Sequence, residues 1–184
     1  MYSFANPQIT IAHPEDIPAI TVLLNKAYRG ETSKQGWTTE ADLIAGDVRT
    51  DENNVQEVMQ QNGSIFLKYT NAEEQIIACV NLQQHADKIY LGMFSVSPKL
   101  QGGGIGKQLL QAAEAYARHL ECISVYMSVI SARTELISWY KRHGYADTGV
   151  RKPFIEDGLT GKHLQELEFM MMEKTLAVQP GSLQ

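Results

Sequence analysis

The residues best placed to do chemistry lie in one short segment that is rich in glycine. Val96 ends an apolar run, Pro98 follows it, and four glycines precede Lys107, where a helical pattern begins. The start of a helix presents unpaired backbone N–H groups and the positive end of its dipole, so an anion binds well there. Glycine lets the backbone approach that anion closely and adopt positive φ values. The segment therefore predicts a cradle for a phosphate or a pyrophosphate.

The spacing of this segment separates three kinds of phosphate cradle. A Walker A loop requires a glycine five residues before its Gly-Lys pair and a Ser or Thr after it, but those positions hold Gln101 and Gln108. The dinucleotide pattern G-x-G-x-x-G also fails, because a residue other than glycine takes its last place in both registers. The pattern that fits is Q-x-x-G-x-G, formed by Gln101, Gly104 and Gly106.

In its strand–turn–helix context, this segment resembles the GNAT superfamily of acyl-CoA-dependent N-acetyltransferases. In that family a strand ends in V-x-P, continues as R/Q-x-x-G-x-G/A and leads into a helix, and residues 96–106 match this pattern throughout. A second segment, residues 137–145, is similar to the family's aromatic-Tyr-x-x-x-Gly-aromatic segment. The order of expected elements resembles the family over residues 8–174.

The resemblance implies acetyl-CoA as co-substrate, with no metal. It places the pyrophosphate on backbone amides of the glycine turn and the pantetheine arm along the end of the preceding strand. The neighbouring strand splays away there in the family, which leaves room for the arm. The implied cofactor-binding residues are Phe94, Ser95, Val96, Gln101, Gly102, Gly103, Gly104, Ile105, Gly106 and Lys107.

By the same resemblance, Tyr140 is the candidate general acid. A phenol with a pKa of about 10 keeps its proton at neutral pH and can donate it to the departing thiolate. The alternative is that Tyr140 only packs beneath the pantetheine arm. The sequence identifies no general base: His85 and Glu31 are candidates, and a solvated surface role is the alternative for both. Relatives often carry asparagine seven residues before this tyrosine, where Arg133 stands here. Its guanidinium either meets a CoA phosphate or faces solvent.

The acceptor is expected to be a primary amine on a small molecule or a peptide. The family builds its acceptor site from two connections, which are residues 29–37 and 151–162 in this chain. Trp37 and Glu31 are the substrate-binding candidates, and a tryptophan in a polar loop normally packs on something. Both connections carry charges of mixed sign, which does not favour a polyamine or an aminoglycoside, because their sites would collect carboxylates.

Helical and alternating apolar patterns supply the elements that hold this site. They predict an α/β fold, an α+β mixed sheet with helices on both faces, to which the resemblance adds mostly antiparallel pairing and a splayed pair of parallel strands. Residues 1–176 form one expected domain, and residues 177–184 form a flexible tail. The predicted strands are residues 8–12, 64–70, 75–82, 88–96, 122–129 and 165–174, and the predicted helices are residues 17–27, 39–45, 54–61, 107–119 and 134–142.

Two of these elements rest on particular side chains. Ile89, Leu91 and Met93 alternate onto one face of the strand at residues 88–96. Thr39 followed by Asp42 is typical of a capping box, which predicts the start of a short helix. The stretch between residues 29 and 37 has no regular pattern and is expected to be irregular.

Composition excludes several classes of function. Of 184 residues, 43% are apolar and 20% charged, which is typical of a globular domain, and a net charge of −5 argues against nucleic acid as a partner. No signal peptide is visible, and no apolar run approaches the ~18 residues of a membrane span. We therefore expect a cytoplasmic protein without a membrane partner. Cys79 and Cys122 lie in apolar runs and are expected to be reduced core residues.

Three other functions stay open beside an N-acetyltransferase. They are a non-catalytic acyl-CoA-binding regulatory module, an acyltransferase whose acceptor is not an amine, and a nucleotide-binding protein. Tyr140 argues against the first, and the two failed fingerprints argue against the last. A homodimer is common in the family, but no residue of this sequence identifies an interface.

Overall fold

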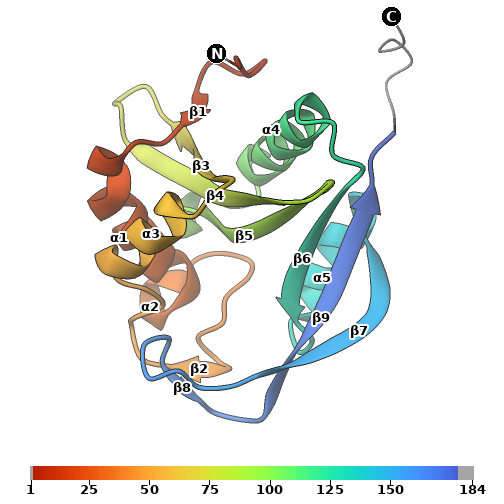
Figure 1. Ribbon diagram of the computed structural model, residues 1–184. Coiled ribbons are helices and arrows are strands. Elements are labelled where there is room, and N and C mark those ends of the chain that lie inside the picture. The colour runs from red at the N-terminus through yellow and green to blue at the C-terminus, as the bar shows by residue number, and fades with distance from the viewer. Residues whose placement is uncertain (1, 178–184) are drawn as a thin grey trace, which may run out of the picture.

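The computed structural model describes residues 2–177, and within them a seven-stranded sheet lies beside a two-stranded ribbon (Figure 1). The sheet has the strand order β1-β3-β4-β5-β6-β9-β7. Its strands are β1 (Ile9–Ile11), β3 (Ser64–Thr70), β4 (Ile76–His85), β5 (Lys88–Val96), β6 (Ser124–Ile130), β7 (Ala146–Phe154) and β9 (Leu167–Thr175), and the ribbon pairs β2 (Ile44–Ala45) with β8 (Lys162–His163).

One pair of strands in the sheet is parallel, and it opens into a gap. β5 and β6 pair only where Lys88, Ile89 and Tyr90 meet Ser124, Val125 and Tyr126. The remaining residues of the two strands make no ladder with each other, whereas β4 and β9 continue to pair on their far sides. The mostly antiparallel sheet with a splayed parallel pair is therefore confirmed.

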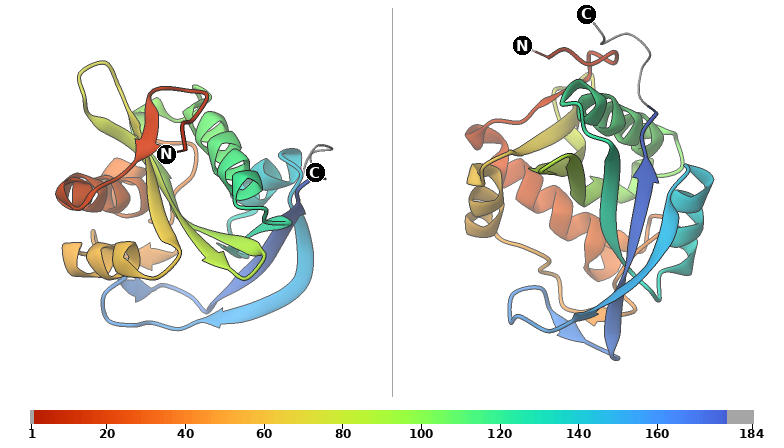
Figure 2. Two further views of the ribbon diagram at one scale, coloured as in Figure 1. Left: turned by 45° about the horizontal axis from the view of Figure 1, so that its top comes forward. Right: turned by 45° about the vertical axis from the view of Figure 1, so that its right-hand side comes forward.

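Helices cover both faces of the sheet, as predicted (Figure 2). The apolar side chains of α1 and α3 pack on one face around Phe66 and Cys79. Those of α4 and α5 pack on the other face around Leu67 and Val80. The helices are α1 (Ile17–Tyr28), α2 (Gly30–Ser33), α3 (Glu52–Gln60), α4 (Ile105–His119) and α5 (Thr134–Arg142), with 3-10 turns η1 (Pro14–Asp16) and η2 (Pro98–Leu100).

A β-bulge near Met93 changes which face the end of β5 presents. The register with β4 shifts between Cys79 and Asn81, and Met93 has a positive φ of 48°. Met93 packs with the α1 cluster, whereas Ile89 and Leu91 belong to the α4 cluster. The expectation that all three share one face was therefore wrong for Met93, because the bulge inserts one residue into the alternation. It also turns the side chains of Phe94 and Val96 to the α4 side.

The predicted helix at residues 39–45 was wrong. The Ala41 N–H does donate to the Thr39 hydroxyl, at 3.0 Å, so the turn forms. Ile44 and Ala45 then pair with β8 instead of continuing a helix, and Ile44 is fully buried in a cluster with Ile130 and Leu167. The supposedly irregular stretch at residues 29–37 in turn contains the short helix α2.

Strand β7 was missed by the sequence analysis, which treated residues 151–162 as a connection. β7 pairs with β9 at the edge of the sheet, and all but one of its side chains are exposed. An exposed edge strand needs no apolar face, so its sequence shows no alternation of apolar and polar residues.

Three remaining predictions concern bulk properties. Cys79 and Cys122 are both buried and unbridged, which agrees with core cysteines. Over residues 2–177, no helix combines the length and the apolar character needed to cross a bilayer. The predicted flexible tail, residues 177–184, lies outside the described residues except for residue 177.

Candidate active site

The glycine turn leaves the start of helix α4 open to a ligand. Gly102 and Gly104 have φ values of 84° and 88°, in the left-handed region that favours glycine. Gly104 is the N-cap residue, and no side chain caps the helix. The first-turn N–H groups of α4 therefore remain available, with the positive end of the helix dipole behind them.

Gln101 folds the turn back onto the end of β5. Its side-chain amide donates to the Val96 carbonyl at 3.1 Å, while its own Oε1 is buried and has no hydrogen-bond partner among the described residues. The side chain lies against Gly36, where any Cβ would collide with it. The Gln101 side chain thus holds the glycine turn against the end of β5.

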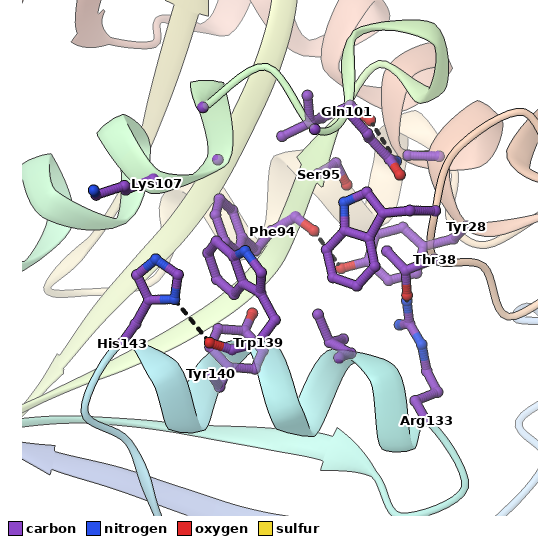
Figure 3. Close-up of a pocket in the computed structure, with 17 residues that line it drawn as sticks. Tyr28, Thr38, Phe94, Ser95, Gln101, Lys107, Arg133, Trp139, Tyr140 and His143 are labelled. Atoms are coloured by element: carbon purple, nitrogen blue, oxygen red, sulfur yellow. Dashed lines mark hydrogen bonds between the residues drawn. The ribbon is translucent and has the colours of Figure 1, made fainter.

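A cavity of about 280 Å³ opens beside this turn (Figure 3). Its walls come from the end of α1, the loop at Trp37, the end of β5, the glycine turn and α5. Among the residues predicted from the sequence, those that line it are Trp37, Phe94, Ser95, Val96, Gln101, Gly102, Gly104, Gly106, Lys107 and Tyr140. Arg133, considered above for a CoA phosphate, also lines it, together with residues that were not proposed for a site: Ala27, Tyr28, Thr38, Leu136, Trp139 and His143.

The structure does not bring every candidate to this cavity. Gly103 and Ile105 belong to the same turn but do not line it, and Ile105 packs on the core. The Glu31 side chain is 88% exposed and pairs with Lys34 at 2.9 Å. His85 is exposed at the end of β4, where its ring lies 6.5 Å from that of Tyr90.

Two residues that line the cavity each have a buried polar atom without a partner. Ser95 Oγ and Gln101 Oε1 are both buried, and neither has a hydrogen bond to any described residue. A buried polar group left unsatisfied costs about 1–3 kcal/mol. A hydroxyl can donate or accept and an amide oxygen accepts, so the pair matches a ligand that carries both a carbonyl and an N–H group. The amides of a pantetheine arm have this composition.

The carbonyl groups at the end of β5 are partly occupied by the protein itself. The Tyr28 hydroxyl donates to the Phe94 carbonyl at 2.7 Å (Figure 3), and Gln101 donates to that of Val96. Burial raises the pKa of Tyr28 to about 12, so this donor stays protonated. The groups that remain for a ligand along this edge are therefore backbone N–H groups and the Ser95 hydroxyl.

Aromatic rings form the opposite wall. Trp139 on α5 lies 6.4 Å from Trp37 and 6.1 Å from Phe94 between ring centroids. His143 packs 4.1 Å from Trp139, and its Nδ1 lies 2.7 Å from the Trp139 carbonyl oxygen. Trp37, which comes from a distant loop, thus closes the cavity over the helix that carries Tyr140.

Tyr140 lies at the bottom of this cavity and is 4% exposed. Burial raises the pKa of its phenol well above the ordinary value of 10, and the neighbouring Tyr28 adds to the increase. Removal from water disfavours the charged phenolate, which is the physical cause. Its hydroxyl therefore remains a donor at every ordinary pH.

A buried ionic network stands behind the cavity. Arg29 is fully buried: its Nε and Nη2 donate to the Thr160 carbonyl at 3.0 and 2.9 Å, and its Nη1 pairs with Glu40. The other oxygen of Glu40 accepts from Arg133 at 3.0 Å, and Arg133 also donates to Thr38 at 2.6 Å. Glu40 thus bridges two guanidinium groups.

This network corrects the interpretation of Arg133 and shows what the sequence left hidden. Arg133 is 6% exposed, so it does not face solvent, and it holds Glu40 and Thr38. Arg29 and Glu40 are separated by 11 residues, and Glu40 and Arg133 by 93. No local pattern signals such a pairing, because only the folded chain brings the three together.

Comparison with known families identifies the fold and the chemistry. A sequence model described as the Acetyltransferase (GNAT) family matches residues 20–145, which include the glycine turn and Tyr140. The chain belongs to this family. It is therefore a GNAT acetyltransferase, and the resemblance seen in residues 96–106 is confirmed. Members of the family use acetyl-CoA or another acyl-CoA as co-substrate and act on amines of small molecules or proteins.

Solved structures of N-acetyltransferases share this fold. A putative phosphinothricin N-acetyltransferase has a TM-score of 0.70 at 12% identity, covering 92% of this chain and 98% of that one. The ribosomal-protein-S18-alanine N-acetyltransferase from Escherichia coli has a TM-score of 0.69 at 14% identity, covering 96% and 97%. A ribosomal-protein-alanine N-acetyltransferase from Brucella melitensis has a TM-score of 0.67 at 19% identity, covering 91% and 99%. A search of curated proteins found no match to this chain.

Proposed function

We propose that this GNAT acetyltransferase transfers an acetyl group from acetyl-CoA to a primary amine of a small molecule or peptide, by direct attack of the amine. The observation that carries the proposal is the shared cavity. The uncapped start of α4, the unpartnered Ser95 Oγ and Gln101 Oε1, and the Tyr140 ring all border it. Together they offer an anion site, a site for amide groups and a protonated donor in one cavity.

Along its length, the co-substrate contacts the anion site first, then the site for amide groups, and then the protonated donor. The backbone amides from Gln101 to Lys107, including those of Gly103 and Ile105, hold the pyrophosphate at the start of α4. The pantetheine amides lie against Ser95, the Gln101 side chain and the free N–H groups at the end of β5, much as an added strand pairs with a sheet edge. Because β5 and β6 pair only at residues 88–90 and 124–126, the end of β5 has no strand beside it on the β6 side and is open to this arm.

In the transfer step, the amine nitrogen forms a bond to the thioester carbon and the carbon–sulfur bond breaks. The sulfur gains a proton and the amine loses one. We assign the donor role at the sulfur to Tyr140, whose raised pKa keeps its proton in place until charge develops on the leaving group.

The amine must reach the thioester without its extra proton. Glu31 and His85 lie away from the cavity, and both oxygens of Glu40 are bound by arginine, so none of these three is free to accept that proton. We therefore propose that water, and not a side chain, accepts the proton that the amine loses. Trp37 lines the first cavity, and we propose that it contacts the acceptor where the amine meets the thioester.

Calorimetry and thiol release test this function directly. Acetyl-CoA should bind with measurable heat whereas ATP should not, and an amine panel should include acceptors that release free CoA thiol. Acetyl-CoA binding without thiol release for any amine would favour a regulatory binding module. Absence of heat with acetyl-CoA would remove the proposal altogether.

A further inference from the structure

A second cavity, of about 140 Å³, lies in the gap where β5 and β6 diverge. Its walls include residues of both strands together with Glu40, Arg49 and Phe154. It adjoins the first cavity, because the two have lining residues in common. The shared residues are Tyr28, Phe94, Arg133, Leu136 and Tyr140. A molecule in the second cavity therefore meets the first at the proposed acid, Tyr140.

The charged groups of this second cavity are mainly cationic. Arg49, Arg133 and Glu40 line it, and Arg29 stands directly behind Glu40. Both carboxylate oxygens of Glu40 are already bound by Arg29 and Arg133. One carboxylate thus faces three guanidinium groups, and the cluster keeps an excess of positive charge.

Arg49 is the cation whose charge is unmatched. Its guanidinium carbon lies 5.4 Å from the centroid of the Tyr28 ring, and within residues 2–177 its side chain has neither an ion pair nor a hydrogen bond. The backbone beside it is held firmly, because the N–H groups of Arg49 and Thr50 donate to the Asn25 side chain at 2.6 and 3.0 Å. The position of Arg49 is therefore set by α1, while its donors remain unused.

Arg133 offers a second unused donor at the same wall. Its Nε is buried without a hydrogen-bond partner among the described residues, and its ion pair with Glu135 is long, at 3.8 Å. Buried polar groups in proteins are normally hydrogen-bonded, so an orphan beside a cavity points to a missing acceptor.

We propose that the second cavity takes the acceptor, and that this acceptor is a small amine which also carries an anionic group, with Arg49 as the counter-ion. This inference rests on the proposed function and adds the substrate class. A guanidinium binds a carboxylate or a phosphonate through two parallel hydrogen bonds, which fixes orientation as well as charge. With its anionic group bound to Arg49, the acceptor would direct its amine toward Tyr140, on the wall that the two cavities share.

The remaining wall of the cavity suits the carbon body of such an acceptor. Met127 and Val129 from β6 and Phe154 and Phe169 from the last strands supply apolar surface. An amine without an anion would place its own positive charge among the guanidinium groups, and like charges at close range disfavour binding. The cavity thus selects for amino-acid-like zwitterions over simple amines.

Matched acceptors test this selection in the intact protein. The panel contains amino acids, their carboxamides, their decarboxylated amines and their aminophosphonate analogues, with thiol release compared per neutral amine. The wild-type protein should favour carboxylate or phosphonate acceptors over the uncharged partners by at least about tenfold in kcat/KM. The carboxylate and phosphonate arms show which anion is preferred.

The Arg49→Ala substitution tests whether Arg49 is the counter-ion of the acceptor. We expect kcat/KM for the anionic acceptors to fall about 10- to 100-fold, mainly through KM, while uncharged amines change less than about threefold. Arg49→Lys should restore part of the preference. Lys26→Ala, which removes an exposed positive charge from α1 outside both cavities, is the matched control and should leave the preference intact.

Failure of this inference is distinguishable from failure of the proposed function. Acetyl-CoA affinity, measured by calorimetry, should be the same in Arg49→Ala and wild type. If acetyl-CoA binds and amines are acetylated without any preference for an anion, or if Arg49→Ala keeps the preference, the inference is overturned while the transferase stands. A preference for cationic polyamines, or for long acyl chains that fill this cavity, would likewise overturn it.

Discussion

At the scale of single residues, Tyr140 is set apart by its burial between two cavities. The same burial that raises its pKa lowers the local dielectric constant around its hydroxyl. A hydrogen bond to a developing thiolate is stronger in such a site than in water. A buried phenol therefore serves better as a donor of one hydrogen bond than as a freely titrating acid.

Replacement of Tyr140 by phenylalanine tests this role. Tyr140→Phe keeps the ring and removes the hydroxyl, so turnover should fall by at least about tenfold. The acetyl-CoA dissociation constant should change less than about twofold, because packing is retained. Steady-state thiol release and calorimetry measure the two effects. Tyr126→Phe, on β6 and outside both cavities, is the control, and unchanged turnover in Tyr140→Phe would leave a packing role only.

The dependence of rate on pH tests the assignment of the amine proton to water. If no side chain accepts it, kcat/KM should rise about tenfold per pH unit until the pH reaches the pKa of the acceptor amine. The raised pKa of Tyr140 keeps the donor protonated, so no alkaline decline is expected below about pH 10. A plateau that begins well below the pKa of the acceptor would instead reveal a titrating base on the protein.

At the scale of elements, the strand–turn–helix unit is the part that can be read from contiguous residues. The limits predicted for β3, β5 and α5 agree with the structure, and α4 begins two residues before its predicted start. Each boundary has a local cause, such as Pro98 after β5 or Gly144 after α5. The bulge at Met93 has no such local cause, because it depends on how β5 pairs with β4.

Substitutions at two neighbouring glycines can distinguish a need for left-handed turn geometry from a need for general flexibility. Gly104 has a φ of 88° with nothing near its missing Cβ, so Gly104→Ala should introduce backbone strain of about 1–2 kcal/mol without a clash. As the turn relaxes, its N–H groups lose alignment, and acetyl-CoA affinity should fall about tenfold or more. Calorimetry gives the affinity, and urea unfolding gives the strain.

Gly103 provides the matched control for that substitution. Its φ is not positive, and a Cβ there would meet only the Leu100 carbonyl oxygen, at 3.5 Å. Gly103→Ala should therefore leave both stability and acetyl-CoA affinity near wild type. Equal losses in the two variants would show that the turn needs flexibility and not left-handed geometry.

At the scale of the whole molecule, the network of Arg29, Glu40 and Arg133 joins segments that are remote in the chain. It ties the end of α1 and the start of α5 to Thr160, in the segment between β7 and β8. Glu40 carries the only negative charge in this group of three, so its removal leaves two buried guanidinium groups without a counter-ion. An unpaired buried charge is strongly destabilising.

Substitution of Glu40 by glutamine measures how much stability depends on that network. Glu40→Gln should lower the free energy of unfolding by about 3 kcal/mol, seen as a lower urea midpoint with an unchanged slope. Glu31→Gln removes a carboxylate whose side chain is 88% exposed and should leave the midpoint unchanged. Equal midpoints for Glu40→Gln and wild type would show that the two arginines do not need this carboxylate.

The sequence alone determined the glycine turn and the helix start that are proposed to bind the co-substrate. Gln101, Gly104 and Gly106 are neighbours in the chain, and the start of a helix is a local structure, so the anion cradle could be recognised before any fold was known. The tertiary structure decided the part proposed here to take the acceptor. Arg29, Glu40 and Arg133 come from separate segments, and the gap that Arg49 faces exists because β5 and β6 pair over only three residues. Local backbone geometry depends on residues that are adjacent in the sequence, whereas charged side chains from distant segments pair only once the chain has folded.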